Sequence, residues 1–228
     1  MKPIDTMNLK ITWLGHAAFL LETDTVRVML DPYNASEAGA YLPIDERADV
    51  VVVSHLNSKY HSHWEAALGT PTRLNGLDFA PSPEGVEAHG IRFRAVPVWE
   101  SPARTVPVSM PYFTIGGVSV CHSGDLGHAL LPADVNAIRG IDVFLAVAGG
   151  PPTTPVADLK AAIDLIRPRI VIPMHYQNGK INLNLCPVDD LLALFNPAQI
   201  IHYPSSTLEV SPDALPLEMR VVVLPSAR

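Results

Sequence analysis

Residues 48–63 read "ADVVVVSHLNSKYHSH", an apolar strand that runs directly into a loop with three histidines. The four valines are apolar on both faces of the strand, which is typical of a central strand buried from two sides. The histidines follow the carboxyl end of this strand, where layered α/β folds collect ligands. Lys59 and Tyr60 lie where a metal-binding loop would have a carboxylate and an imidazole.

Short apolar runs bounded by turn residues recur outward from this stretch and predict further strands. Residues 143–148 ("VFLAVA") and 170–173 ("IVIP") are also apolar on both faces and predict central strands. Helices are predicted over residues 63–69, 130–140, 154–168 and 187–196. The first third is rich in strands and the second half alternates strands with helices, which indicates a layered α/β protein with two sheets and helices outside.

Several of these strands end in a residue that can bind a metal or move a proton. The six residues at strand ends are His16, Asp31, His55, Glu100, Asp125 and His175. Each has an ordinary structural explanation when taken alone, and Asp31 before Pro32 is most simply a turn residue. Because the carboxyl ends of strands meet in layered α/β folds, the set together predicts one convergent site.

Composition narrows the classes of partner. The 228 residues suit one domain, residues 1–228, and a net charge of −7 without a Lys/Arg cluster gives no reason to expect nucleic acid. No stretch approaches the roughly 18 apolar residues of a membrane span. The N-terminal "MKPIDTMNLK" has no apolar core of a secretory signal, so we expect a cytoplasmic protein.

The motifs "ITWLGHAAFLLET", "VMLDPY", "ADVVVVSH", "RAVPVWES", "SVCHSGDLG" and "PRIVIPMHY" resemble, in this order, those of the metallo-β-lactamase superfamily. The resemblance runs from about residue 9 to 180 and is strongest to the branch of L-ascorbate-6-phosphate lactonase and related metal-dependent hydrolases. It implies a four-layer αβ/βα sandwich, in which two mixed β-sheets are flanked by helices and a metal site lies along one edge.

The chain departs from the family's first metal motif, His-x-His-x-Asp-His. Aligned without a gap, His55 keeps the first position, while Asn57, Lys59 and Tyr60 replace the other three ligands. A one-residue insertion would instead bring His61 into the last position. Further along, Glu100 replaces the next family histidine, Asp125 matches the bridging aspartate, and His175 matches the final histidine.

These matches imply two incomplete metal positions that share Asp125. His55 and Glu100 would be the remaining ligands of the first position, and His61 and His175 would be those of the second. The ammonium group of Lys59 would repel a second cation or replace it, unless the side chain points outward. We therefore expect one divalent metal per chain rather than two. The reduced number of imidazoles favours manganese or iron, with zinc as a further candidate.

The resemblance implies a metal-dependent hydrolase of a lactone, phosphoester or amide, with a small-molecule substrate and a homo-oligomeric assembly. Asp125 or His61 would move protons, and Lys59 or Asn57 would stabilise oxyanion charge. His16 would contact a ligand residue or the substrate, and His122 would either orient Asp125 or serve in packing. Arg104 would either contact an anionic substrate or be a solvated residue of an exposed loop. The alternative is a non-catalytic descendant that has lost its metals and binds a small molecule or a protein.

Overall fold

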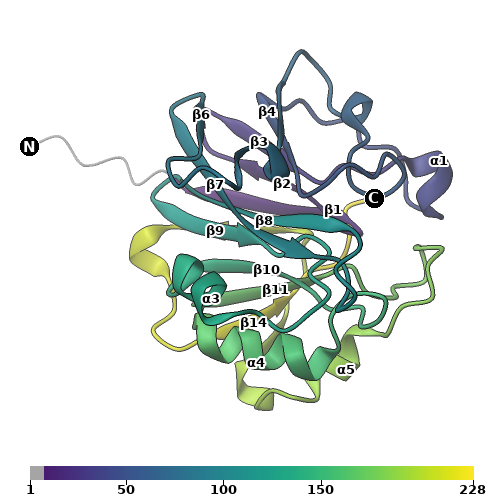
Figure 1. Ribbon diagram of the computed structural model, residues 1–228, viewed down its shortest axis with the longest axis vertical. Coiled ribbons are helices and arrows are strands. Elements are labelled where there is room, and N and C mark those ends of the chain that lie inside the picture. The colour runs from purple at the N-terminus through teal and green to yellow at the C-terminus, as the bar shows by residue number, and fades with distance from the viewer. Residues whose placement is uncertain (1–7) are drawn as a thin grey trace, which may run out of the picture.

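Two mixed β-sheets form the centre of the computed structural model, which describes residues 8–228 (Figure 1). The strands of the first sheet are β1 (Leu9–Gly15), β2 (Ala18–Glu22), β3 (Arg27–Leu30), β4 (Val50–Val53), β5 (Thr72–Asn75) and β13 (Thr207–Val210). The strands of the second are β6 (Val86–Ala88), β7 (Ile91–Trp99), β8 (Pro107–Ile115), β9 (Val118–His122), β10 (Val143–Val147), β11 (Ile170–Met174), β12 (Ile200–His202) and β14 (Arg220–Val223). Residues 1–7, which carry most of the stretch used to argue against a secretory signal, lie outside the described residues.

Each sheet combines antiparallel strands with a run of parallel strands. The first sheet has the order β13-β1-β2-β3-β4-β5, with β3, β4 and β5 parallel. The second has the order β12-β14-β11-β10-β9-β8-β7-β6, with β9, β10, β11 and β14 parallel. The predicted architecture of two mixed sheets flanked by helices is confirmed.

The valine strand β4 is buried on both faces, as predicted. Val50 and Val52 belong to the main core between the sheets, whereas Val51 and Val53 belong to a second core on the outer face. This alternation follows from the two-residue period of a strand. Tyr33 and Tyr41 complete the outer core, so both faces of the first sheet are covered.

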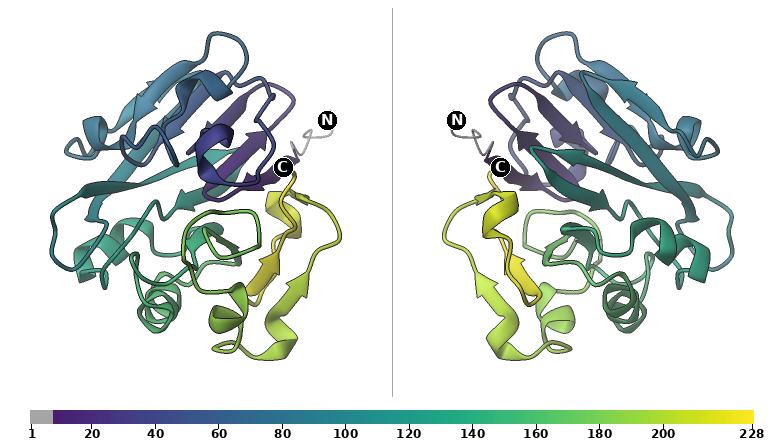
Figure 2. Two further views of the ribbon diagram at one scale, coloured as in Figure 1. Left: turned by 90° about the vertical axis from the view of Figure 1, so that its right-hand side faces the viewer. Right: turned by 90° about the vertical axis from the view of Figure 1, so that its left-hand side faces the viewer.

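The helices are α1 (Ala35–Ala38), α2 (Gly76–Phe79), α3 (Pro132–Ile138), α4 (Val156–Ile166) and α5 (Val188–Leu192). Helices α4 and α5 cover the side of β10, β11 and β14 that faces away from the first sheet (Figures 1 and 2). Helix α4 begins after Pro155 and ends at Arg167, which has a left-handed backbone and precedes Pro168. None of the described helices is long and apolar enough to cross a membrane.

The predicted helix over residues 63–69 is wrong. Only Trp64–Ala66 form a short 3₁₀ turn. The backbone N–H groups of His63 and Leu68 donate to Pro32 and Glu46, and Gly69 has a positive φ. Contacts with neighbouring segments therefore satisfy the backbone better than a continued helix would, and they leave the histidine loop irregular.

Candidate metal centre

His61 is the central residue of a buried polar cluster at the edge where the two sheets meet. Its Nδ1 atom lies 2.9 Å from Oδ2 of Asp31, and its Nε2 atom lies 2.9 Å from Oδ2 of Asp125. The carbonyl oxygen of Asn57 accepts hydrogen bonds from the backbone N–H groups of residues 60–62. This tight turn after β4 fixes the backbone from which the His61 side chain reaches the cluster.

Asp31 joins the ends of two neighbouring strands. Its Oδ1 atom accepts from the backbone N–H of Ser54 at 2.7 Å, and its Oδ2 atom accepts from the Ser54 hydroxyl at 2.6 Å. The same hydroxyl oxygen lies 3.0 Å from Nδ1 of His55. Asp31 is therefore far more than a turn residue, because it orients His61 directly and His55 through Ser54.

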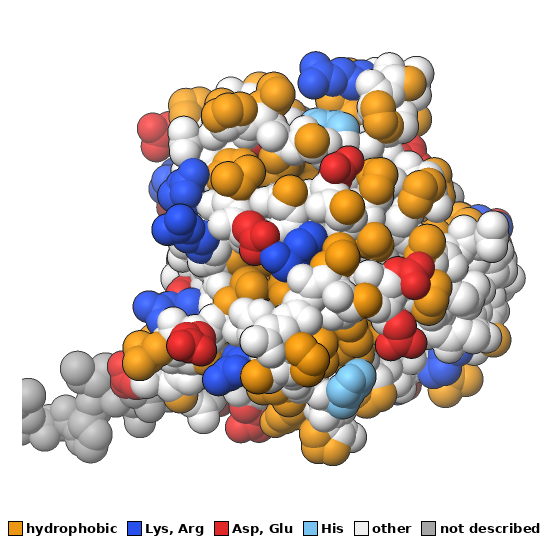
Figure 3. Space-filling view, turned by 90° about the horizontal axis from the view of Figure 1, so that it is seen from below, with side chains coloured by type: hydrophobic (Ala, Val, Ile, Leu, Met, Phe, Trp, Pro, Cys, Tyr) orange, Lys and Arg blue, Asp and Glu red, His pale blue; other side chains and the backbone are white. Residues whose placement is uncertain are grey.

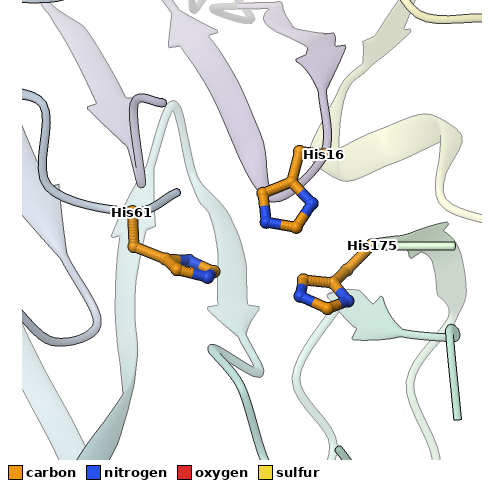
Figure 4. Close-up of side chains that lie close together, drawn as sticks. All are labelled: His16, His61 and His175. Atoms are coloured by element: carbon orange, nitrogen blue, oxygen red, sulfur yellow. The ribbon is translucent and has the colours of Figure 1, made fainter. Parts of the chain in front are cut away.

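His16 and His175 come from strands of different sheets and are joined through their backbones. The N–H of His175 donates to the carbonyl of His16 at 2.9 Å, and the indole N–H of Trp13 donates to the same carbonyl at 3.0 Å. The two imidazole rings lie 4.2 Å apart between centroids, and Figure 4 shows them with His61 around a common space. Strands β1 and β11 thus deliver two histidines to one point.

Backbone conformation is unusual at this centre. Six of the described non-glycine residues have a positive φ, and three of them are His16, Asp31 and His175. Such residues are uncommon outside glycine and tend to occur at functional sites, where the surrounding structure holds them in place. The surrounding hydrogen bonds supply that support here.

Several buried polar atoms of the cluster have no hydrogen-bond partner. They are Nδ1 and Nε2 of His16, Nδ1 of His175 and Oδ1 of Asp125. Nε2 of His175 lies 3.3 Å from Oδ1 of Asp125, but without hydrogen-bond geometry. Leaving a buried polar group unpaired costs about 1–3 kcal/mol, so such groups are rare unless a ligand or ion satisfies them.

The donor atoms are close enough to share a metal ion. One group consists of His16, His61 and His175, and the other of His55, His61 and Asp125; within each group the ligand atoms lie within 4.8 Å of one another. Imidazole and carboxylate donors are those that hold catalytic zinc, with three protein ligands and an open position. The residues present therefore fit a divalent metal.

Burial and charge set the protonation of this centre. Burial lowers the pKa of His61, but Asp125 and Asp31 outweigh it and raise the pKa to about 10. Burial raises the pKa of Asp125, and His61 and His175 more than offset it, so the pKa stays well below its usual range. Burial lowers the pKa values of His16, His55 and His175, which leaves these three imidazoles neutral and able to bind metal.

Three predicted site residues lie outside both groups. Glu100 is half-buried, and burial together with the charge of Asp125 raises its pKa, but it belongs to neither group. Lys59 makes no ion pair with Asp125 and lies with its ammonium group 4.9 Å from the centre of the Tyr60 ring. Arg104 is exposed. Glu100 is thus close enough to feel the charges of Asp125 and His61, whereas Lys59 contacts Tyr60.

Two further predicted residues have mainly structural contacts. Asn57 caps the turn of the histidine loop with its carbonyl and its side chain. His122 lies between Gly124, whose N–H donates to Nδ1, and the carbonyl of Ala17, which lies 2.9 Å from Nε2. Among the described hydrogen bonds, His122 makes none to Asp125; its Nδ1 atom lies 4.0 Å from Oδ2 of Asp31, and its bond to Gly124 shapes the loop that carries Asp125.

Sequence reasoning missed the role of Asp31. The signal was present, because Asp31 closes the apolar run of β3 just as His55 closes that of β4. Its position before Pro32 is equally typical of a turn residue, so the sequence alone does not separate the two roles. Only the pairing of β3 with β4 shows that the two strand ends lie side by side.

Comparison with known proteins gives consistent results. Residues 10–175 match the family model described as "Beta-lactamase superfamily domain". A UPF0173 metal-dependent hydrolase of Archaeoglobus fulgidus is 30% identical over 196 residues, which cover 74% of this chain and 83% of that protein. A UPF0173 metal-dependent hydrolase of Methanopyrus kandleri is 29% identical, and the alignment covers 74% of this chain and 84% of that protein.

Solved structures share the fold. A Thermotoga maritima protein described as a Zn-dependent hydrolase of the metallo-beta-lactamase superfamily aligns with a TM-score of 0.76 and 32% identity, over 95% of this chain and 98% of that one. A protein from Parabacteroides distasonis aligns with a TM-score of 0.62 and 18% identity, over 95% of this chain and 92% of that one. At that identity, the second match supports the fold alone.

Proposed function

The chain belongs to the metallo-β-lactamase superfamily and to its UPF0173 family, and from this premise we propose that it is a metal-dependent hydrolase of a small ester-type substrate. One observation carries the proposal. Buried imidazole and carboxylate atoms converge from both sheets and lack hydrogen-bond partners. Without a metal these groups would stay unpaired, so the geometry favours the hydrolase over a metal-free binding protein.

We propose one cation per chain, with zinc as the first choice and iron or manganese next. Both donor groups contain His61, whose Nδ1 is engaged by Asp31 and whose Nε2 has only one lone pair. One histidine of this kind cannot serve two cations. Manganese or iron would suit a site with few imidazoles, whereas the four histidines of the two groups suit zinc better.

The chemistry divides between the bound cation and the surrounding residues. A divalent cation held here would polarise a substrate oxygen and lower the pKa of a water molecule. Asp125 presents an unpartnered Oδ1 that can accept the proton of the attacking water and return it to the leaving group. Asp31 holds the His61 ring in one orientation. We propose that Lys59, which is half-exposed, pairs with negative charge on a substrate.

For the substrate we propose a lactone, a phosphoester or an amide, the three classes that the family resemblance implies. The test uses protein stripped with a chelator and reloaded with one equivalent of zinc, iron or manganese, then assayed with chromogenic esters, phosphodiesters and amides and with simple lactones. Asp125→Asn should abolish metal-dependent turnover, and the exposed Asp213→Asn should retain it. The proposal fails if reloaded protein hydrolyses none of these classes, or if turnover is the same without metal.

A further inference from the structure

The histidine loop has lost family ligands unevenly from the two metal positions. In the gapless alignment, Asn57 replaces one ligand of the first position, whereas Lys59 and Tyr60 replace two ligands of the second. We propose that His16 takes the place of the aspartate lost at Lys59, so that His16, His61, His175 and Asp125 hold the cation at the second position. This inference rests on the proposed function and specifies its metal site.

The His16 side chain has the properties of an unfilled ligand. It is 1% exposed, and neither ring nitrogen has a hydrogen-bond partner. One of its nitrogens lies within 4.8 Å of ligand atoms of His61 and His175. The rings of these two residues lie 5.1 and 4.2 Å from the His16 ring between centroids, and Figure 4 shows all three directed toward one space. Packing alone does not explain a buried imidazole with two unpaired nitrogens.

The backbone holds His16 in this place. Its carbonyl accepts from Trp13 and from His175, and its φ of 50° is left-handed. The preceding Gly15 has a φ of 123°, and a Cβ there would lie 2.6 Å from Cε1 of Tyr41. The backbone of the turn after β1 is therefore closely constrained at Gly15 and His16. A rigid ligand of this kind is what a metal site requires.

The first position lacks enough ligands for a cation. If His61 serves the second position, the first keeps only His55 and the shared Asp125. Asn57 is used in the loop turn, and Glu100 lies outside both groups. A catalytic metal site normally has three protein ligands, so one position is complete and the other is not.

Replacing His16 by glycine provides a sharp test, because glycine accepts the left-handed backbone. His89→Gly is a matched control, since His89 has a φ of 49° but is exposed and contacts Thr72. Zinc affinity is measured by competition with a chelator. Cobalt-substituted protein is examined by visible spectroscopy and by NMR, which counts the shifted N–H signals of coordinated imidazoles.

Wild-type protein should bind one equivalent of zinc and show three coordinated imidazoles. His16→Gly should bind zinc at least about 100-fold more weakly and show two, because loss of a ligand should cost no less than loss of a supporting residue. Added imidazole should restore the signal, and His89→Gly should match wild type. Unchanged affinity and spectrum in His16→Gly, or two equivalents of zinc in wild type, would overturn the inference and leave the hydrolase standing. A wild-type protein that takes up no metal would overturn both.

Discussion

The Nε2 atom of His61 lies 2.9 Å from Oδ2 of Asp125, although the two residues come from different sheets. His61 follows β4 of the first sheet, and Asp125 follows β9 of the second. Both side chains are buried, so their contact ties together the edge where the sheets meet. The other donors of the proposed metal centre, His16, His55 and His175, lie around this pair.

Asp125→Ala should abolish metal uptake. Asp125 is the one carboxylate in either donor group, and it contacts both His61 and His175. Metal content is measured by elemental analysis of protein purified without a metal-binding tag. The exposed Asp213→Ala serves as the control. Equal metal content in Asp125→Ala and wild type would show that Asp125 does not hold the cation.

Asp31→Asn should weaken metal binding about 10- to 100-fold without changing the number of ions bound, as expected for a residue that orients a ligand. Asp31 fixes His61 and bonds to Ser54. Chelator competition measures the affinity. Asp49→Asn is the matched control, because the Asp49 carboxylate also accepts a hydrogen bond from a backbone N–H group, that of Arg27, but lies outside the metal centre. Equal losses in both variants would indicate a general effect on the fold.

The metal-free protein should lose stability as the pH rises from about 6.5 toward 10. Asp125 and Asp31 raise the pKa of His61 from 6.5 to about 10, against the effect of burial. The stabilising charge is therefore fully present below pH 6.5 and disappears as His61 loses its proton. Urea unfolding with a chelator present should show this slope in wild type and in His89→Gln, and a flatter one in His61→Gln. Parallel curves for all three proteins would contradict the assigned shift.

Gly124→Ala should destabilise the fold by about 2 kcal/mol or more, because it combines strain with steric conflict. A Cβ at Gly124, whose φ is 54°, would lie 2.6 Å from the carbonyl oxygen of Ser109 and 2.9 Å from Cβ of Ser54. Gly90→Ala separates the two effects, since Gly90 has a φ of 75° but open space around it. Its cost should be about 1 kcal/mol, from backbone strain alone. Equal midpoints of urea unfolding would show that the loop adapts.

Arg104→Ala should raise KM for an anionic substrate and leave kcat nearly unchanged. Arg104 is exposed and belongs to neither donor group, so it would act on binding rather than on chemistry. Steady-state kinetics with a charged and an uncharged substrate of the same class measure the difference. An unchanged KM for the anionic substrate would remove Arg104 from the substrate contacts. This test depends on a substrate from the screen above.

The surface opposite the first sheet offers no further guide to partners. In the view from below, basic and acidic side chains occur among hydrophobic ones over the face on the side of α4 and α5 (Figure 3). The expectation of a small-molecule substrate therefore depends on the buried centre and not on this face.

The sequence alone determined the central strands and the positions at which they end. Apolar runs of four or more residues must be buried, and β4, β10 and β11 are buried on both faces as predicted. Since strand ends carry His55, Asp125 and His175, the existence of a convergent site and its edge followed from local pattern. Burial follows from the two-residue period of a strand, and the position of the site follows from the edge of the sheet at which the strands end.

Tertiary structure decided which loop residues enter the centre. Residues 55–63 have no regular period, so their orientation depends on bonds such as those from the loop to Asn57 and Pro32. These bonds place His61 in the cluster and Lys59 beside Tyr60. In the same way, His16 meets His175 only because β1 and β11 belong to sheets packed face to face. Contacts between residues this far apart in the chain have no local signal, since they arise when the two sheets pack together.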